Sequence, residues 1–256
     1  MQFDSVWENT AANLETLQKK YVVLSKERCD LLVFPELFHA GFSMQPELFA
    51  ESIEGEVSQA LADLAKQSSI NIVAGVAQRK VRSNCDGKQV NFFNTALAFN
   101  SKGEQVGFYA KQKLFSYANE DKRYTAGYKS EIIHISGEPF ALFICYDLRF
   151  PELFREVAKK VKGFIILANW PETRQAHWEA LLKARAIENQ CFVIGVNRMG
   201  QDGKGLQYNG GSSVISPQGE LLLYADKNTE FSVVEIDLKD VDEVRKQYPF
   251  LEDMKP

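Results

Sequence analysis

The sequence predicts an α/β fold with mixed sheets, and two observations carry that prediction. Short apolar runs of strand length alternate with segments of helical periodicity along all 256 residues. Some of the runs are joined by short turns, as in hairpins, whereas others are separated by a helix. Two roughly similar halves would permit a sandwich of two sheets between helices. No low-complexity linker or charge block divides the chain, so we expect a single domain over residues 1–256.

The first half of the chain predicts two helices and four strands. A first helix follows a candidate cap at Asn9 or Thr10, and its apolar residues recur at helical spacing as Leu14, Leu17, Tyr21 and Leu24. A second helix carries Val57, Leu61 and Leu64 on one face. The expected strands cover residues 30–34, 71–77, 91–99 and 105–109, with a hairpin turn at 100–103 between the last two.

The second half begins with a polar stretch at residues 111–130, which we interpret as a long loop, a kind of segment that often carries function. Further strands are expected at 132–135, 140–145, 164–168, 192–196, 212–215, 221–224 and 233–236. Helices are expected from Pro151 and over 174–189, the latter with Trp178, Leu181 and Leu182 on its apolar side. The glycines between 200 and 211 match no phosphate-binding motif and predict a flexible loop.

Composition excludes several classes of protein. The hydrophobic share of 45% suffices for a sizeable core. The net charge of -4, with both signs mixed, lacks the basic patch of a nucleic-acid binder. Apolar runs are too short to span a membrane. The first residues lack a signal-peptide pattern and the four cysteines are sparse, so we expect a cytoplasmic protein with reduced thiols.

Glu36 is the first candidate for chemistry. It stands at the end of the expected strand 30–34, after Pro35, where a rigid strand can aim a side chain into a crevice. Its neighbours Leu37 and Phe38 are apolar, and apolar surroundings raise the pKa of a carboxyl group toward the range of a general base. The alternative is a capping or salt-bridged residue at a strand end.

Lys111 is the second candidate, because a lysine just after a strand can hold a fixed cation over a pocket. Lys113 follows two residues later, and on an extended chain both side chains point the same way. The alternative is an ordinary pair of solvated lysines.

Cys145 is the third candidate. It ends an apolar run and precedes the helix expected at Pro151, so it occupies a strand-to-helix turn rich in free backbone N–H groups. A helix N-terminus and a nearby lysine would both lower the pKa of the thiol. The alternative is a small buried hydrophobic residue.

A carboxylate, an ammonium and a thiol, each at a strand end, form a complete set for acyl transfer. A Cys–His pair would have to draw on His39, His134 or His177, of which His134 fits a core position and His177 a packing role. No cluster has the spacing of metal ligands, so we expect no metal.

Three segments, taken together, resemble the signature segments of the nitrilase superfamily of carbon–nitrogen hydrolases, and the resemblance extends from Gln2 to about Tyr248. They are Phe34-Pro-Glu36, Tyr109-Ala-Lys-Gln-Lys-Leu-Phe115 and Cys145-Tyr-Asp-Leu-Arg-Phe-Pro-Glu152. The resemblance implies a four-layer α-β-β-α sandwich, pairing through the helices on the cysteine side into a homodimer, and no cofactor.

The resemblance also implies roles for individual residues. Glu36, Lys111 and Cys145 occupy the positions of the catalytic triad, with Lys111 a better match than Lys113. Glu120 matches a second glutamate that helps to hold the lysine and the substrate. The backbone N–H of Tyr146 matches the donor to the oxyanion.

Within the superfamily the chain is most similar to omega-amidases that deamidate 2-oxoglutaramate. Segments 36–44, 168–174, 184–190 and 195–203 carry this likeness. Such a small amide substrate has a carboxylate at its far end, and Arg174 is our candidate to bind it. Phe42, Phe115 and Trp170 are candidates for the pocket wall, whereas Arg149 and Arg185 are expected to hold structure through ion pairs.

Several alternatives stay open at this point. The same three residues would serve a nitrilase, an N-carbamoyl amino acid hydrolase or a general aliphatic amidase, and a non-catalytic binding protein could share the fold. Members of the superfamily usually have several more residues of a first strand than precede Gln2 here. We therefore expect that strand to be short or absent, with an outer position of the sheet unfilled.

Overall fold

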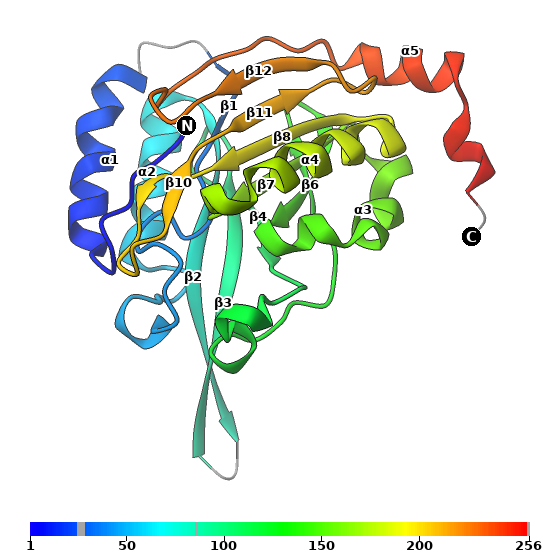
Figure 1. Cartoon of the computed structure of the whole chain (residues 1–256). Helices are drawn as coiled ribbons and strands as arrows, with labels where there is room; N and C mark the ends of the chain where they lie inside the picture. Colours follow the sequence, from blue (N-terminus) through cyan, green and yellow to red (C-terminus); the bar gives the residue numbers. More distant parts are fainter. Residues whose placement is uncertain (25–28, 85–86, 255–256) are drawn as a thin grey trace.

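A computed structural model, which describes residues 1–24, 29–84 and 87–254, has two stacked sheets between two pairs of helices (Figure 1). The predicted α/β class with mixed sheets and the four-layer sandwich are confirmed. Residues 239–254 project away from the two sheets.

The first sheet has the order β1-β2-β3-β4, in which β1 and β2 are parallel and the other pairs are antiparallel. Its outer face is covered by two helices whose buried side chains include Leu14, Leu17 and Leu61. The side chains of Tyr21 and Leu24 lie outside the described residues. The elements are α1 (Thr10–Leu24), β1 (Leu31–Val33), α2 (Glu56–Ser68), β2 (Asn71–Asn84), β3 (Gly87–Phe99) and β4 (Gln105–Ala110).

The second sheet has the order β12-β11-β8-β7-β6-β5, with β6, β7 and β8 parallel at its centre. Trp178 and Leu182 of one covering helix are fully buried against it, as predicted. The elements are β5 (Ile132–Ile135), β6 (Glu138–Ile144), α3 (Pro151–Val157), β7 (Gly163–Ala168), α4 (Gln175–Asn189), β8 (Phe192–Asn197), β11 (Ser212–Ile215) and β12 (Leu221–Ala225).

The main core fills the space between the two sheets. Val73 and Tyr109 of the first sheet meet Phe143 and Ile165 of the second in one apolar cluster. All six residues of β7 are buried, because this central parallel strand is covered on both faces. That is why a continuous apolar run predicted it.

Short 3₁₀ segments shape the connections. The long loop at 111–130 is confirmed and contains two of them, and the helix expected from residue 174 begins with another. They are Pro46–Leu48, Ser116–Ala118, Glu120–Lys122, Cys145–Arg149, Ala158–Lys160, Glu172–Arg174 and Phe250–Asp253.

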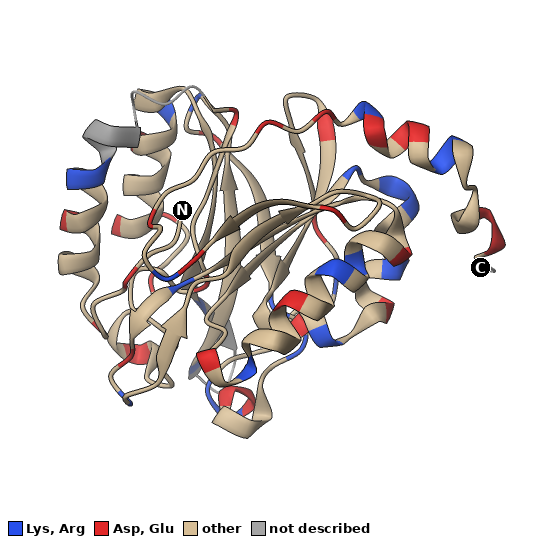
Figure 2. Cartoon of the chain, turned by 45° about the horizontal axis from the view of Figure 1, so that its top comes forward, with Lys and Arg blue, Asp and Glu red and all other residues tan. Residues whose placement is uncertain are grey.

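Two expectations were wrong, and one helix was not predicted. Residues 233–236 pair with no strand and are irregular, although their pattern favours one. The glycine-rich stretch near 200–211 contains the hairpin of β9 (Met199–Gln201) and β10 (Gln207–Asn209), held by Asp202, which accepts the backbone N–H groups of Lys204 and Leu206. The sequence also gave no sign of α5 (Lys239–Gln247), whose charged residues of both signs leave only Val241 and Val244 to bury (Figure 2).

Cys145 and Cys191 are free thiols, and Cys85 lies outside the described residues. Among the helices of residues 1–24, 29–84 and 87–254, none has the length and hydropathy to cross a membrane.

Candidate active site

Three chain segments that are far apart in the sequence converge at one end of the stacked sheets. Glu36 follows β1, Lys111 follows β4 and Cys145 follows β6. Cys145 lines a cavity of about 330 Å³. The fold therefore brings together the three residues that the strand-end pattern singled out.

Lys111 forms the centre of the cluster and is fully buried. Its Nζ atom donates to Glu36 Oε1 at 2.8 Å and to Glu120 Oε2 at 2.9 Å. Burial alone would lower the pKa of the ammonium, but the Glu120 and Glu36 carboxylates outweigh it and raise the pKa well above its usual value. Lys111 is thus a permanent, fixed cation beside the sulfur.

Lys113 has a different environment, contrary to the expectation that both lysines point the same way. Its side chain is partly exposed, 3.6 Å from Glu152, and lies over the ring of Phe150. The backbone bends at Gln112 and Lys113 instead of continuing as an extended strand, so the two-residue alternation ends at Lys111.

The Glu36 carboxylate is buried, but its environment is polar and not apolar as its sequence neighbours suggested. Besides the hydrogen bond from Lys111, Oε1 of Glu36 accepts one from the side-chain amide of Asn94 at 2.8 Å. Its Oε2 accepts a hydrogen bond from the backbone N–H of Asn169 at 2.8 Å. These bonds hold the carboxylate next to the cysteine, where it can receive and return a proton.

Asn94 and Asn169 are functional candidates that the sequence did not reveal. The Nδ2 group of Asn94 donates to Glu36 and, at 2.9 Å, to Glu120, so it bridges the two carboxylates. Asn169 Nδ2 also donates to the backbone carbonyl of Glu36 at 2.6 Å. The backbone carbonyl oxygen of Asn169 lies 3.8 Å from Cys145 Sγ. Only their position, one inside β3 and one just after β7, could have indicated them.

Glu120 is equally buried and reaches the cluster from the long loop. Besides Lys111 and Asn94, it accepts the backbone N–H of Phe115 at 2.6 Å, which ties the loop to the site. Burial raises the pKa of its carboxyl group; Lys111 opposes this effect and Glu36 adds to it.

Cys145 begins a 3₁₀ turn directly after β6 with a φ of 46°, a left-handed conformation that is uncommon for a residue with a side chain. Such a sharp turn after a strand exposes a nucleophile to a cavity. The N–H of Tyr146 is at the start of this turn, where backbone donors have no partner within the helix. Tyr146 lines the cavity, so its N–H is a candidate donor there.

Asp147 holds that turn in place. Its carboxylate accepts the backbone N–H of Ile144 at 2.9 Å, the hydroxyl of Tyr109 at 2.8 Å and the backbone N–H of Lys113 at 2.8 Å. Burial raises the pKa of the Asp147 carboxyl to about 6. One side chain thus links the cysteine turn to the segment that carries Lys111.

The pKa of the Cys145 thiol is shifted in the direction opposite to the one expected. Burial and the Glu36 carboxylate raise its pKa well above the ordinary value, and Lys111 offsets only part of this increase. The predicted lowering by a helix N-terminus and a lysine was wrong, because the second negative group and desolvation outweigh the cation. The resting nucleophile is a neutral thiol that needs a base.

The residues proposed for the pocket wall all line the cavity: Phe42, Phe115, Trp170 and Arg174. The guanidinium carbon of Arg174 lies 5.6 Å from the ring centre of Phe115. Lys204, which the sequence analysis did not name, lines the cavity too. The lining of the cavity is therefore rich in aromatic and cationic side chains.

Of the two arginines assigned to structure, only Arg185 fits, because it pairs with Glu188 at 2.8 Å and donates to the carbonyl of Leu148. Arg149 instead lines the cavity, lies over the ring of Trp170 at 4.9 Å and contacts His177 Nδ1 at 3.0 Å. It forms no ion pair with the described residues.

The histidines do not provide a partner for Cys145. His39 is buried and already bonded to Ala77 N and Thr10 Oγ1, and burial lowers its pKa to about 3. His134 is exposed on the edge strand β5, so the core position expected for it was wrong. His177 is exposed beside Arg149 and is not packed in the core. Within the described ranges no group of three or more acidic, cysteine or histidine side chains could hold a metal ion.

Comparison with known proteins agrees with this geometry. A family model described as carbon-nitrogen hydrolase matches residues 1–246. The chain is 35% identical to the omega-amidase YafV of Escherichia coli K12, over 99% of this chain and 94% of that protein. It is 32% identical to the 2-oxoglutaramate amidase of Bacillus subtilis, over 100% and 96%. The crystal structure of XC1258 from Xanthomonas campestris, a CN-hydrolase superfamily protein, superposes with a TM-score of 0.89 at 30% identity, covering 100% of this chain and 95% of that one.

Proposed function

Because the chain belongs to the carbon-nitrogen hydrolase family, we propose that it is an omega-amidase acting on a short omega-amide keto acid. The best candidates are 2-oxoglutaramate and 2-oxosuccinamate, each of which would be hydrolysed to the dicarboxylate and ammonia. The names of the Escherichia coli and Bacillus subtilis relatives support this branch of the family.

One observation carries the proposal: a buried lysine held by two carboxylates, beside a thiol at the edge of a small cavity. Lys111 supplies positive charge, Glu36 supplies a proton acceptor and Cys145 supplies the nucleophile. A binding protein would have no need for this arrangement, because burying three charges is costly unless they are used.

The first half-reaction forms a thioester. The Cys145 sulfur attacks the carbonyl carbon of the amide while its proton passes to Glu36. The oxygen of the tetrahedral intermediate becomes negative and is stabilised by the Lys111 ammonium and the Tyr146 backbone N–H. Glu36 then gives its proton to the amide nitrogen, the C–N bond breaks, and ammonia leaves.

The second half-reaction regenerates the enzyme. Glu36 takes a proton from a water molecule, whose oxygen attacks the thioester carbonyl. The same two donors stabilise the second tetrahedral intermediate. The C–S bond breaks, the carboxylic acid product leaves, and the proton on Glu36 returns to the Cys145 sulfur. Glu120 and Asn94 act by keeping Lys111 and Glu36 in position.

We assign the far carboxylate of the substrate to Arg174, since a guanidinium can bind a carboxylate with two hydrogen bonds. Its position beside Phe115, at the cavity wall, supports this role. Arg174→Ala should raise KM for a carboxylate-bearing amide by about tenfold with little change in kcat. An unchanged KM would shift the assignment to Arg149 or Lys204, which also line the cavity.

The decisive experiment measures ammonia release from a panel of substrates at equal concentration. It would contain 2-oxoglutaramate, 2-oxosuccinamate, propionamide, a short aliphatic nitrile and an N-carbamoyl amino acid. The omega-amide keto acids should give a kcat/KM at least about a hundredfold above the others. A preference for the nitrile or the carbamoyl compound would place the enzyme in another branch of the family.

We also propose a cytoplasmic homodimer. The free thiols of Cys145 and Cys191 suit a reducing compartment. Ile187 on α4 is 48% exposed, and Leu221 and Tyr224 on β12 are exposed too, so the side that carries the cysteine helices offers apolar area for a partner. Light scattering of the native chain and of Ile187→Asp would test the pairing, which the charge should weaken.

A further inference from the structure

Asp147 is a fully buried carboxylate that the proposed reaction does not use. Among residues 1–24, 29–84 and 87–254 it forms no ion pair. Its oxygens are occupied instead by three neutral donors, the Ile144 and Lys113 backbone N–H groups and the Tyr109 hydroxyl. A buried charge without a cation beside it is costly, so its presence next to the reacting groups points to a use.

The three donors belong to the two segments that carry the nucleophile and the cation. Ile144 directly precedes Cys145, whereas Tyr109 and Lys113 stand two residues on either side of Lys111. The Lys111 ammonium itself bonds to the carboxylates of Glu36 and Glu120. Asp147 therefore fixes the cysteine turn relative to the lysine segment by a path separate from these ion pairs.

The geometry of the three bonds requires an ionised carboxyl group. Backbone N–H groups can only donate, so a proton on Asp147 has to face the Tyr109 hydroxyl, which can also accept. That hydroxyl binds Oδ2, the same oxygen that accepts the Ile144 N–H. A protonated Oδ2 is a poor acceptor, so the hydrogen bond from Ile144 weakens. The next residue, Cys145, has a φ of 46°, and such a conformation persists only where the surroundings hold it.

We propose that Asp147 is a positioning residue whose ionised form keeps the Cys145 sulfur aligned with Glu36 and Lys111. In the acid form the turn relaxes, and the thioester forms more slowly although the cavity still binds the amide. The inference rests on the proposed function, because it concerns the step in which Cys145 attacks.

The groups that face Asp147 place its titration in an accessible range of pH. Burial raises the pKa of its carboxyl group to about 6, against the opposing effects of the Ile144 and Lys113 N–H groups, the Lys111 charge and the Tyr109 hydroxyl. Burial and the Asp147 charge raise the pKa of Tyr109 well above its usual value, so its hydroxyl stays a neutral donor. We therefore expect kcat to fall on the acidic side with a midpoint near pH 6.

Stability should respond to this proton in the opposite direction from activity. The pKa of Asp147 is raised from 3.8 to about 6, so the folded chain binds more protons than the unfolded chain between these values. Protonation of this group therefore stabilises the fold as the pH falls through this range. A loss of kcat near pH 6 that comes from Asp147 is thus not a loss of the fold.

The test measures kcat and KM from pH 5 to pH 8.5 with the best amide of the substrate panel. Asp147→Asn keeps the shape of the side chain, but its NH₂ group faces one of the donors. It should lower kcat about a hundredfold at pH 8, change KM less than about threefold and remove the acidic midpoint near pH 6. The control is Asp226→Asn, at an exposed aspartate that accepts the Asn228 N–H and the Thr229 hydroxyl. It should change kcat less than about twofold.

Tyr109→Phe is the milder variant, and it decides the question if Asp147→Asn does not fold. It removes one donor but leaves the carboxyl group able to ionise. A hydrogen bond to the ionised form is stronger than one to the neutral form, so the acidic midpoint should move up by about one pH unit. The kcat at pH 8.5 should fall far less than in Asp147→Asn.

Melting temperatures separate positioning from a purely structural role. From pH 7 to pH 5 the native chain should gain stability relative to Asp147→Asn, while its kcat falls. An acidic midpoint that is unchanged in both variants would overturn the proposal, because it would belong to another group. If the native chain releases ammonia from none of the amides, the proposed function fails, and this inference fails with it.

Discussion

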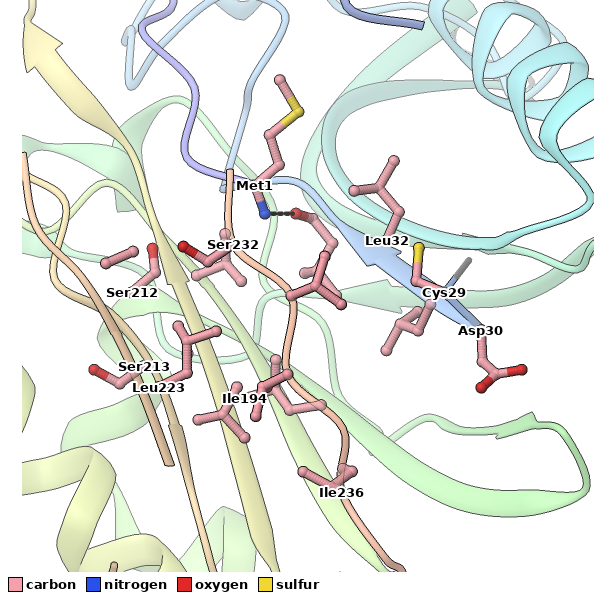
Figure 3. Close-up of a pocket in the computed structure, with 18 of the residues that line it drawn as sticks. Met1, Cys29, Asp30, Leu32, Ile194, Ser212, Ser213, Leu223, Ser232 and Ile236 are labelled. Carbon is pink, nitrogen blue, oxygen red and sulfur yellow. Dashed lines mark hydrogen bonds between the residues drawn. The ribbon is translucent and has the colours of Figure 1, made fainter. Parts of the chain in front are cut away.

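The catalytic cavity and the larger cavity beside β1 differ in the chemistry of their surroundings. At the catalytic cavity, Lys111 lies between Glu36 and Glu120, and Asn94 bridges both carboxylates. The larger cavity is lined mostly by apolar side chains, among them Leu32, Ile194 and Leu223 (Figure 3). The comparison teaches that paired buried charges, and not cavity volume, mark the site for chemistry.

The largest effect should come from the sulfur itself. Cys145→Ala removes the sulfur that forms the thioester, so kcat for ammonia release should fall by about 10⁴-fold or more while the melting temperature stays within a few degrees. Cys191→Ala is the matched control, because that buried thiol lies outside the cavity and its loss should leave kcat nearly unchanged. Turnover near the native value in Cys145→Ala would end the proposed mechanism.

Removing the central cation tests whether charge pairing holds the catalytic cavity together. Lys111→Met leaves Glu36 and Glu120 buried with no positive charge between them, which should cost about 3–5 kcal/mol of unfolding free energy. Urea denaturation measures this loss. Lys113→Met, at a partly exposed lysine, should cost less than about 1 kcal/mol. Similar losses in both variants would contradict the claim that pairing at Lys111 is special.

Asn94 tests positioning without a change of charge. Asn94→Ala removes both bridging hydrogen bonds, so kcat should fall about a hundredfold with a smaller change in KM. The pKa of the Glu120 carboxyl should also rise, since the Asn94 hydrogen bond is one of the contacts that lower it. Asn91→Ala, on the same strand but outside the cluster, is the control. A fall in stability without any change in kcat or in the pKa of Glu120 would make Asn94 merely structural.

Sequence reasoning reached the parts of this molecule that local pattern determines. The six apolar residues of β7 could hardly be anything but a buried strand, and Glu36, Lys111 and Cys145 were found because each follows a strand. Their convergence required the family resemblance as well as the pattern. The four-layer sandwich was likewise predicted from the family resemblance together with the pattern of strands and helices.

The remainder depends on neighbours that are distant in the chain. Asn94 and Asn169 are uncharged amides whose importance arises from Glu36, which lies 58 and 133 residues away. The direction of the Cys145 pKa shift depends on how burial and Glu36 compare with Lys111, and no spacing reveals that balance. Residues 233–236 have the composition of a strand, but a strand also needs a partner, which composition does not report.

The raised pKa of Cys145 has a consequence for how this enzyme survives in a cell. Peroxides and alkylating agents attack thiolates, and a protonated sulfur is a poor target for them. At rest, Cys145 should therefore be modified more slowly than an ordinary surface cysteine. The reactive anion exists only while Glu36 holds the proton. Glu36 therefore activates the sulfur during catalysis and also limits its reaction with other electrophiles.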